Sequence, residues 1–126
     1  MKILKRTVLK KARKMKVTDL VKQLNLTVFS GSDGLDREVT GGYTSDLLSD
    51  VMGHADAGKV WITIQTHKNV MAIASLKDLP AVIITSGEKP GEDTIEQSNA
   101  EGIPVLGTTM RSFEVSAGVF NLLSAK

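Results

Sequence analysis

Small polar residues follow the apolar runs in the second half of this chain, and their chemistry suits anion binding. Thr66 and His67 come after one run, Ser86 and Gly87 after the next, and Thr108 after the last. Ligands of open α/β sheets bind outside the carboxyl ends of the strands, where the N–H groups of the following helix attract negative charge. We therefore expect a site for a phosphate-like anion here. The alternative is that the hydroxyls only cap helices.

The segment from Asp36 to Asp50, DREVTGGYTSDLLSD, contributes the other candidates. Glycine lets another group approach the backbone closely. Gly41 and Gly42 therefore predict a strand that bends where another group comes near its backbone. Arg37 could bind a phosphate or carboxylate through two hydrogen bonds. It could instead pair with an acidic side chain across a subunit interface, or hold the bend of residues 40–42 in place. The predicted ligand-binding residues are Arg37, Thr40, Gly41, Gly42, Asp46, Thr66, His67, Ser86, Gly87 and Thr108.

The stretch from Gly53 to Val60, GHADAGKV, is close to a nucleotide-binding P-loop but fails in two respects. The motif ends in Ser or Thr, whose hydroxyl binds magnesium, and Val60 has no hydroxyl. A P-loop also runs from a strand into a helix, whereas here a helix is expected before the loop and a strand after it. The stretch therefore does not predict a kinase or NTPase.

Metal and catalytic sites are not expected from this sequence. The chain has no cysteine, and His54 and His67 are its only histidines. A metal site needs three or four converging ligands, and no local spacing supplies them. We predict no catalytic residue, no metal and no cofactor, and hence a protein that is not an enzyme.

Strand-like and helix-like patterns alternate along the chain. Strands are expected at 26–29, 39–44, 60–64, 81–85 and 105–108, and helices are expected after Thr18 or Asp19, after Ser45 or Asp46, and over 67–77, 91–101 and 112–123. This order implies right-handed βαβ crossovers. We predict a single α/β domain whose largely parallel sheet of about five strands is flanked by helices, with an antiparallel edge from the elements before Thr44.

Charge is distributed unevenly over the 126 residues. Residues 1–14 hold seven basic residues and no acidic one, which leaves nine basic and 14 acidic residues, a charge of −5, in the remainder. We divide the chain into a basic arm, residues 1–14, and a domain, residues 15–126. Met1, Leu4, Val8, Ala12 and Met15 recur at helical spacing, so the arm could be an amphipathic helix that binds an anionic surface or packs in an oligomer.

The arm could equally be a simple tail, because charge runs are more often solvated than functional, and nucleic acid is not an expected partner. No apolar run approaches the 18 residues of a membrane span, and no secretory signal follows the basic start. We expect a cytoplasmic protein. Apolar Val39, Tyr43, Trp61 and Phe120 in so small a domain favour a homodimer that covers exposed apolar surface.

Asp36, Arg37, Thr40, Gly41 and Gly42, in this order, resemble the residues that give the DRTGG domain its name. The resemblance continues through WITIQTHKNV and IPVLGT and covers roughly residues 15–125. DRTGG domains are also similar to the N-terminal domain of HPr kinase/phosphorylase, a family whose phosphotransfer site lies in a separate C-terminal domain. The resemblance therefore implies the non-catalytic half only.

DRTGG domains also occur between CBS domains in certain pyrophosphatases and before the catalytic part of some phosphotransacetylases. In those settings the resemblance implies a regulatory, subunit-associating or adenine-nucleotide-sensing module. Copies beside genes of redox metabolism suggest a redox-metabolism protein as a partner. The function expected is thus a regulatory module that binds an adenine nucleotide or another anionic metabolite. The alternative is a homo-oligomeric interaction scaffold with no small-molecule ligand.

Overall fold

The computed structural model describes residues 15–125, and the basic arm, residues 1–14, lies outside the described residues. Four parallel strands form the centre of the sheet: β2 (Gly41–Thr44), β3 (Lys59–Thr63), β4 (Val82–Ile84) and β5 (Val105–Gly107). The first strand, β1 (Thr27–Ser30), pairs antiparallel with β5, which gives the order β1-β5-β4-β3-β2. The predicted α/β fold, with five mostly parallel strands and an early antiparallel edge, is confirmed.

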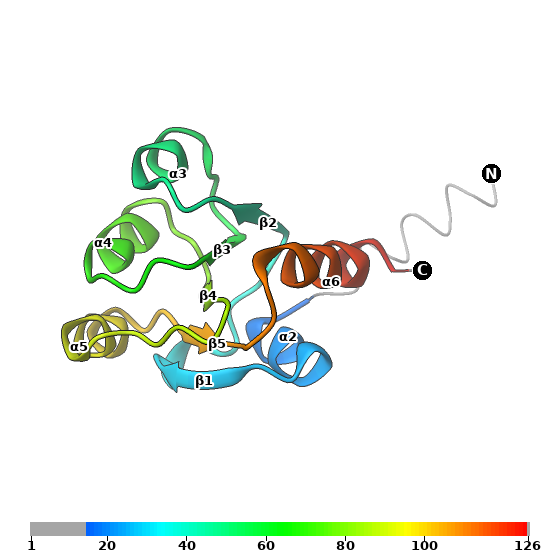
Figure 1. Cartoon of the computed structure of the whole chain (residues 1–126), viewed down its shortest axis with the longest axis horizontal. Coiled ribbons are helices and arrows are strands. Elements are labelled where there is room, and N and C mark those ends of the chain that lie inside the picture. Colours follow the sequence, from blue (N-terminus) through cyan, green and yellow to red (C-terminus); the bar gives the residue numbers. More distant parts are fainter. Residues whose placement is uncertain (1–14, 126) are drawn as a thin grey trace.

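Helices cover both faces of this sheet (Figure 1). One face carries α3 (Leu48–His54), α4 (Asn69–Leu76) and α5 (Glu92–Glu101), and the other carries α2 (Val17–Leu24) and α6 (Ser112–Ser124). A short 3₁₀ helix, η1 (Ser32–Gly34), follows β1. Each of β3, β4 and β5 is therefore reached from the preceding parallel strand through a helix on the same face, and α6 joins α2 on the other face.

The central strands are apolar throughout because both of their faces are covered. On β3, Trp61 points into the core beneath α3 and α4, while Val60 and Ile62 point into the core beneath α2 and α6. On β4, Ile84 and Ile83 divide between the two cores in the same way. Burying side chains of this size stabilises the fold by about 1.5–3 kcal/mol each.

The segment 31–40, here called the amino-edge strap, returns the chain from β1 to β2 at the opposite edge. It crosses the amino ends of the strands between them. Gly31 packs against the carbonyl group of Ile103, just before β5. The backbone N–H of Thr40 donates to the carbonyl oxygen of Gly58, just before β3, at 2.9 Å. The strap thus fixes where β2 joins the parallel strands.

The expected helix starts are found in part. The N-cap residues of α2, α3 and α6 are Lys16, Leu47 and Arg111, which differ from the residues expected to start these helices. Asp19 accepts a hydrogen bond from the backbone N–H of Lys16 at 2.8 Å, and the Ser45 hydroxyl accepts one from the N–H of Leu47 at 3.2 Å. Asp46 and Ser112 instead bond to neighbouring strands, because partners brought by the tertiary fold compete with local capping.

Two of the four apolar residues offered as evidence for a homodimer are buried. Val39 is 3% exposed and Trp61 is fully buried, so neither can contribute to an interface. Phe120 remains exposed, at 69%. The homodimer stays a prediction, but its supporting residues have to be chosen differently.

Candidate functional site

The predicted ligand-binding residues fall at two opposite edges of the sheet. Six of them lie where the parallel strands end, at the carboxyl edge: Asp46, Thr66, His67, Ser86, Gly87 and Thr108. The other four precede or begin β2 at the amino edge: Arg37, Thr40, Gly41 and Gly42. β2 has four residues, and a strand of that length carries the chain about 13 Å. One small ligand at a strand end therefore does not reach both groups.

Asp46 joins the end of β3 to the start of α3. Its Oδ1 accepts hydrogen bonds from the hydroxyl of Thr63 and from the backbone N–H of Ile64, both at 2.9 Å. The side-chain amide of Gln65 donates to the Asp46 carbonyl oxygen at 2.8 Å. The carboxylate is thereby occupied in holding the strand end, which leaves it poorly suited to act as a base.

A chain of hydroxyl groups continues along the same edge. Thr85, after β4, shares a 2.8 Å hydrogen bond with Ser112 at the start of α6. Ser116, one turn later, donates to the Ser112 carbonyl oxygen at 2.6 Å and shares a 2.7 Å bond with Thr44 at the end of β2. These bonds fix the ends of β2 and β4 to α6, so the edge is organised before any ligand arrives.

The turn after β4 has an unusual backbone. Ser86 has φ +61° and Gly87 has φ +77°, and a non-glycine residue rarely adopts a positive φ. The N–H of Ser86 donates to the Met110 carbonyl oxygen at 2.7 Å, and that of Gly87 donates to the Thr108 carbonyl oxygen at 2.9 Å. These N–H groups bind the loop after β5, so they are not free for an anion.

His67 presents a hydrogen-bond donor to solvent. Its Nδ1 lies 3.2 Å from the backbone N–H of Asn69, from which it accepts a hydrogen bond. The neutral ring therefore carries its proton on Nε2. Because the side chain is exposed, this N–H can reach an acceptor outside the protein.

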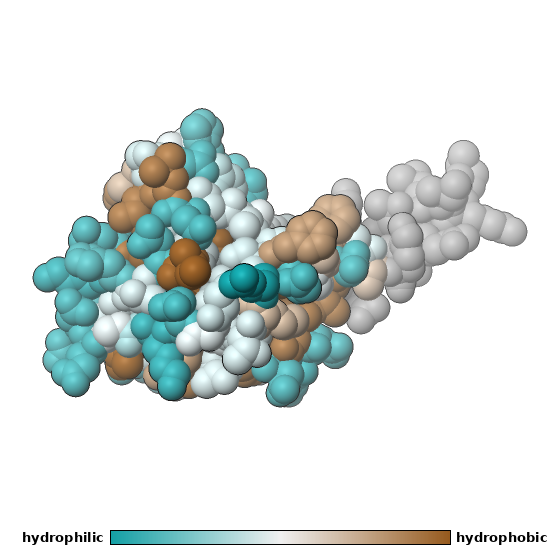
Figure 2. Space-filling view, in the orientation of Figure 1, coloured by the Kyte–Doolittle hydropathy of each residue, from teal (hydrophilic) through white to brown (hydrophobic). Residues whose placement is uncertain are grey.

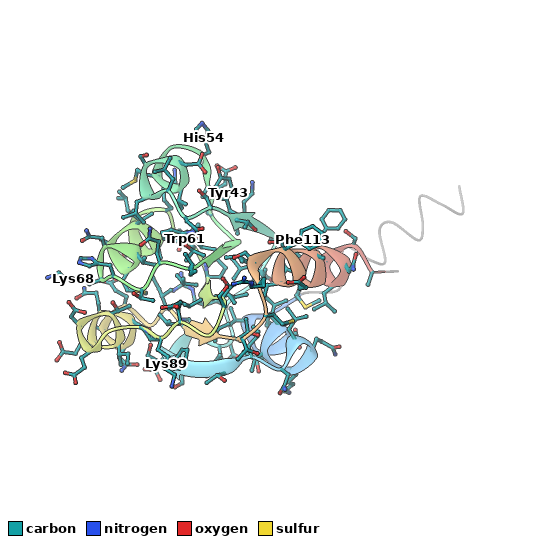
Figure 3. The ribbon with its side chains drawn as sticks, viewed as in Figure 1. Tyr43, His54, Trp61, Lys68, Lys89 and Phe113 are labelled. Carbon is teal, nitrogen blue, oxygen red and sulfur yellow. The ribbon has the colours of Figure 1, made fainter. Side chains whose placement is uncertain are left out.

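Three exposed cations near the carboxyl edge were missed by the sequence analysis. Lys68, Lys89 and Arg111 follow β3, β4 and β5, respectively, and within residues 15–125 their side chains make no ion pair or hydrogen bond. Figure 3 places Lys68 beside α4 and Lys89 nearer to β1, so the cations are spread along the row of strand ends. The usable signal was their position one to five residues beyond a predicted strand.

Arg37 makes structural contacts at the amino edge. Its Nη2 lies 3.0 Å from Oδ1 of Asp78, before β4, and its Nη1 lies 3.4 Å from the Gly102 carbonyl oxygen, before β5. The side chain is 30% exposed. The acidic partner of Arg37 thus lies in the same chain, whereas the sequence had suggested one across a subunit interface.

Thr40, Gly41 and Gly42 line a groove of about 650 Å³ between β2 and α6. A Cβ atom at Gly42 would lie 3.4 Å from Cγ1 of Val119 on α6, within ordinary contact distance. The two glycines thus line this groove with backbone atoms and add no side chain to it. We call it the α6 groove.

One cluster of polar groups has shifted pKa values. Hydrogen bonds from the Ser45 and Tyr43 hydroxyls lower the pKa of Asp50, and His54 adds a favourable charge. The Tyr43 hydroxyl donates to Oδ2 of Asp50 at 2.9 Å, which in turn raises the pKa of Tyr43. Figure 3 shows His54 at the tip of α3, away from the strand ends. The cluster fastens α3 to β2.

The structure confirms the rejection of the P-loop. Gly53 lies within α3, and Lys59 opens β3 with its Nζ 3.5 Å from Oδ2 of Asp56. The helix thus precedes the loop and the strand follows it. Among residues 15–125, no three His, Asp or Glu side chains are grouped so as to hold a metal ion, and no described helix is long and apolar enough to cross a membrane.

Comparisons with known proteins identify relatives. No family model matches the chain. HPr kinase/phosphorylase of Levilactobacillus brevis is 30% identical over 87% of this chain and 40% of its own length. The enzyme of the same name from a Geobacillus strain is 24% identical over 90% of this chain and 41% of its length. The chain thus spans about 40% of the length of these relatives.

A solved structure shares the fold. It contains the CBS and DRTGG domains of the regulatory region of Clostridium perfringens pyrophosphatase, with a TM-score of 0.63 and 16% identity over 82% of this chain and 45% of the other. The resemblance read from residues 36–42 is thereby confirmed: the chain is a relative of the N-terminal region of HPr kinase/phosphorylase and has the fold of a DRTGG-containing regulatory region.

Proposed function

We propose that this chain is a non-catalytic regulatory module whose carboxyl edge binds an anionic metabolite, with an adenine nucleotide as the first candidate. The observation that carries the proposal is the set of unpaired donors at the strand ends: the exposed N–H of His67 and the cations Lys68, Lys89 and Arg111. Phosphate groups are bound by such donors. The hydroxyl chain beside them keeps the edge preorganised, which lowers the cost of binding.

A protein of the same fold supports the choice of an adenine nucleotide. The pyrophosphatase regulatory region that shares this fold is complexed with an activator, diadenosine tetraphosphate. The carboxylate at this edge, Asp46, accepts hydrogen bonds from Thr63 and Ile64 that hold the strand end. Binding without chemistry, which shifts the equilibrium of a homodimer or of a partner protein, is the mechanism that these contacts support.

Thermal unfolding in the presence of AMP, ATP, diadenosine tetraphosphate and inorganic phosphate tests the proposal. A ligand present at one hundred times its dissociation constant stabilises the folded chain by about 2.7 kcal/mol. The shift should shrink in Lys68→Gln and Arg111→Gln and should persist in the control Lys22→Gln, which removes an exposed cation on α2. No shift with any of the four compounds would contradict ligand sensing.

A second candidate function, the interaction scaffold, is favoured by an exposed apolar pair. Leu47 is 64% exposed and Ile64 is 40% exposed. The two residues lie near each other because the N–H of Ile64 donates to the carboxylate of Asp46, which precedes Leu47 in the sequence. A scaffold using this pair would form an oligomer without added ligand. Light scattering should then show dissociation in Leu47→Ser/Ile64→Ser but not in Leu76→Ser, whose exposed side chain lies on α4.

A further inference from the structure

β2 forms an outer edge of the sheet that no other described strand covers. Its parallel register aligns Thr44 with Ile62 on β3, and the N–H of Ser45 donates to the Ile62 carbonyl oxygen at 3.2 Å. Because the N–H and C=O groups of successive residues point to opposite sides of a strand, those of Tyr43 then point to β3. The groups of Gly42 and Thr44 therefore point outward, where they can pair with another strand.

The face of α6 that borders this edge carries an exposed stripe. Its members line the α6 groove and recur at intervals of four, three and four residues: Phe113, Ala117, Phe120 and Ser124. This is the spacing of positions a and d, through which two helices pack along each other. Figure 2 shows the apolar surface over α6, and Figure 3 shows the Phe113 ring standing out from the helix. The stripe therefore has the pattern of a helix that packs against a second helix.

The middle of the stripe lies beside the middle of β2. The hydroxyls of Thr44 and Ser116 share a hydrogen bond of 2.7 Å. A Cβ atom at Gly42 would lie 3.4 Å from Cγ1 of Val119. The two outward residues of β2 are thus next to the two central turns of α6, and one two-fold axis can pass close to the middle of both elements.

The outer side of β2 is complementary to itself across such an axis. In an antiparallel pair of β2 strands centred on Tyr43, Gly42 of each copy stands opposite Thr44 of the other. Residues opposite each other in this way exchange two N–H···O bonds. The pairing would continue the sheet from one copy into the next and would satisfy the outward groups of both strands.

The stripe of α6 is complementary to itself as well. The same two-fold axis makes the two α6 helices antiparallel, which reverses the order of the stripe in one copy. Phe120 then meets Ala117 of the second copy, and Phe113 meets Ser124 of the second copy. Large side chains opposite small ones let two elements pack without voids.

Charge and area both fit a second copy. None of the described residues that line the α6 groove is charged, so two copies bring no like charges together, whereas an anionic or strongly basic partner would find no opposite charge. Phe113 is 81% exposed and Phe120 is 69% exposed, so covering these rings in both copies removes about 600 Å² from solvent. That is about half of the 1,200 Å² or so of the smallest stable interfaces, and the edge of β2 and the rest of the groove adjoin the rings.

We propose that two copies of the chain pair across the outer edge of β2, with their sheets joined antiparallel and their α6 stripes packed together. An interface near the lower limit of size gives a reversible dimer with a dissociation constant of about 1 µM or above, so β2 is an open edge at lower concentrations. The pairing needs no ligand at the carboxyl edge. Its failure would therefore leave the proposed anion binding untouched.

Sedimentation velocity of the full-length chain without nucleotide, from about 0.1 µM to about 100 µM, tests the pairing. Ala117→Glu places like charges on both sides of the axis and should raise the dissociation constant at least about a hundredfold. Leu76→Glu, at an exposed position on α4, is the control and should leave the constant unchanged. A mixture of Ala117→Glu with Ala117→Arg should form the dimer again, because opposite charges then meet.

A natural chain that stays monomeric up to about 100 µM would overturn the proposal and leave the edge of β2 to an extended peptide of another protein. Equal dissociation constants for the natural chain and Ala117→Glu would also overturn it. So would a mixture of the two charged variants that stays monomeric.

Amide exchange by NMR provides an independent readout on the strand itself. At about 100 µM, the N–H groups of Gly42 and Thr44 should exchange at least about tenfold faster in Ala117→Glu than in the natural chain, because their outer partners are lost. The N–H of Tyr43 points to β3 and serves as the internal control, so its exchange should change less. Equal exchange of Gly42 and Thr44 in the two proteins would rule out strand pairing at this edge.

Discussion

Gly34 lies so close to the carbonyl oxygen of Gly102 that a side chain cannot replace its hydrogen atom. A Cβ atom there would also stand 2.8 Å from Cδ of Pro104. Together with the ion pair between Arg37 and Asp78, this contact holds the amino-edge strap against the loops before β4 and β5. Gly34 and Arg37 thus act at the residue scale by fixing the backbone of the strap.

Replacing Gly34→Ala should lower the free energy of unfolding by about 1–3 kcal/mol, because the added methyl group meets backbone atoms that cannot move aside cheaply. Chemical denaturation measures this change. The control is Gly53→Ala on α3, where an added Cβ meets nothing within 4 Å and helix propensity favours alanine by about 1 kcal/mol. Similar losses in both variants would contradict the close approach at Gly34.

The Tyr43–Asp50 hydrogen bond should give an acid-dependent contribution to stability. The pKa of Asp50 is lowered by the Ser45 and Tyr43 hydroxyls, so this contribution is present above the unfolded pKa of 3.8 and is lost as the pH falls through the folded value. The difference in melting temperature between the natural chain and Tyr43→Phe should therefore shrink between about pH 5 and about pH 2. A difference in melting temperature that stays constant over this pH range would contradict an acid-dependent contribution from Asp50.

At the scale of elements, Asp46 shows how the carboxyl edge is held together. Its carboxylate accepts hydrogen bonds from Thr63 and Ile64 at the end of β3, and Asp46 itself lies just before α3. Removing the acceptor leaves the Thr63 hydroxyl, which belongs to a buried residue, without its partner. The residue serves two elements at once, which a role as a helix cap would not do.

We expect Asp46→Ala to cost about 1–3 kcal/mol of stability, and Asp46→Asn to cost less because the amide keeps one acceptor oxygen. Denaturant unfolding of the three proteins gives the comparison. Amide exchange at Ile64 should accelerate in the alanine variant. Equal stability of Asp46→Ala and the natural chain would show that the strand end is held by other contacts.

The elements themselves could be predicted because β-branched runs such as 81–85 and helical spacing are properties of short segments. The candidate site could be predicted only in part. Arg37 and Asp46 are nine residues apart in sequence, and the strand predicted at 39–44 between them already implies opposite edges of the sheet, which their grouping into one candidate site overlooked. Lys68, Lys89 and Arg111 were missed because an unpaired surface cation has no sequence pattern that distinguishes it from a paired one.

For the whole molecule, the order of strands sets the distribution of stability. β4 has neighbours on both sides and helices on both faces, whereas β2 ends the sheet beside the α6 groove. Residues 82–84 are all buried, but Gly42 and Thr44 on β2 are exposed. Central strands open only with the whole fold, and edges open by smaller local motions.

The amide exchange rates of the strands should therefore differ. Amides of β4 should exchange no faster than global unfolding allows, and amides of β2 should exchange faster under the same conditions. Mass spectrometry or NMR of the full-length chain measures both. Protection of β2 equal to that of β4 would show that its outer edge is covered.

The amino-edge strap and β1 also bear on how the chain folds during its synthesis. β1 finds its strand partner in β5, and the strap rests on Gly102 and Ile103, some 70 residues later in the sequence. The first quarter of the domain therefore leaves the ribosome long before its partners exist. It has to wait until β5 has been synthesised, so completion of the native state should depend on the emergence of residues 102–107 from the ribosome.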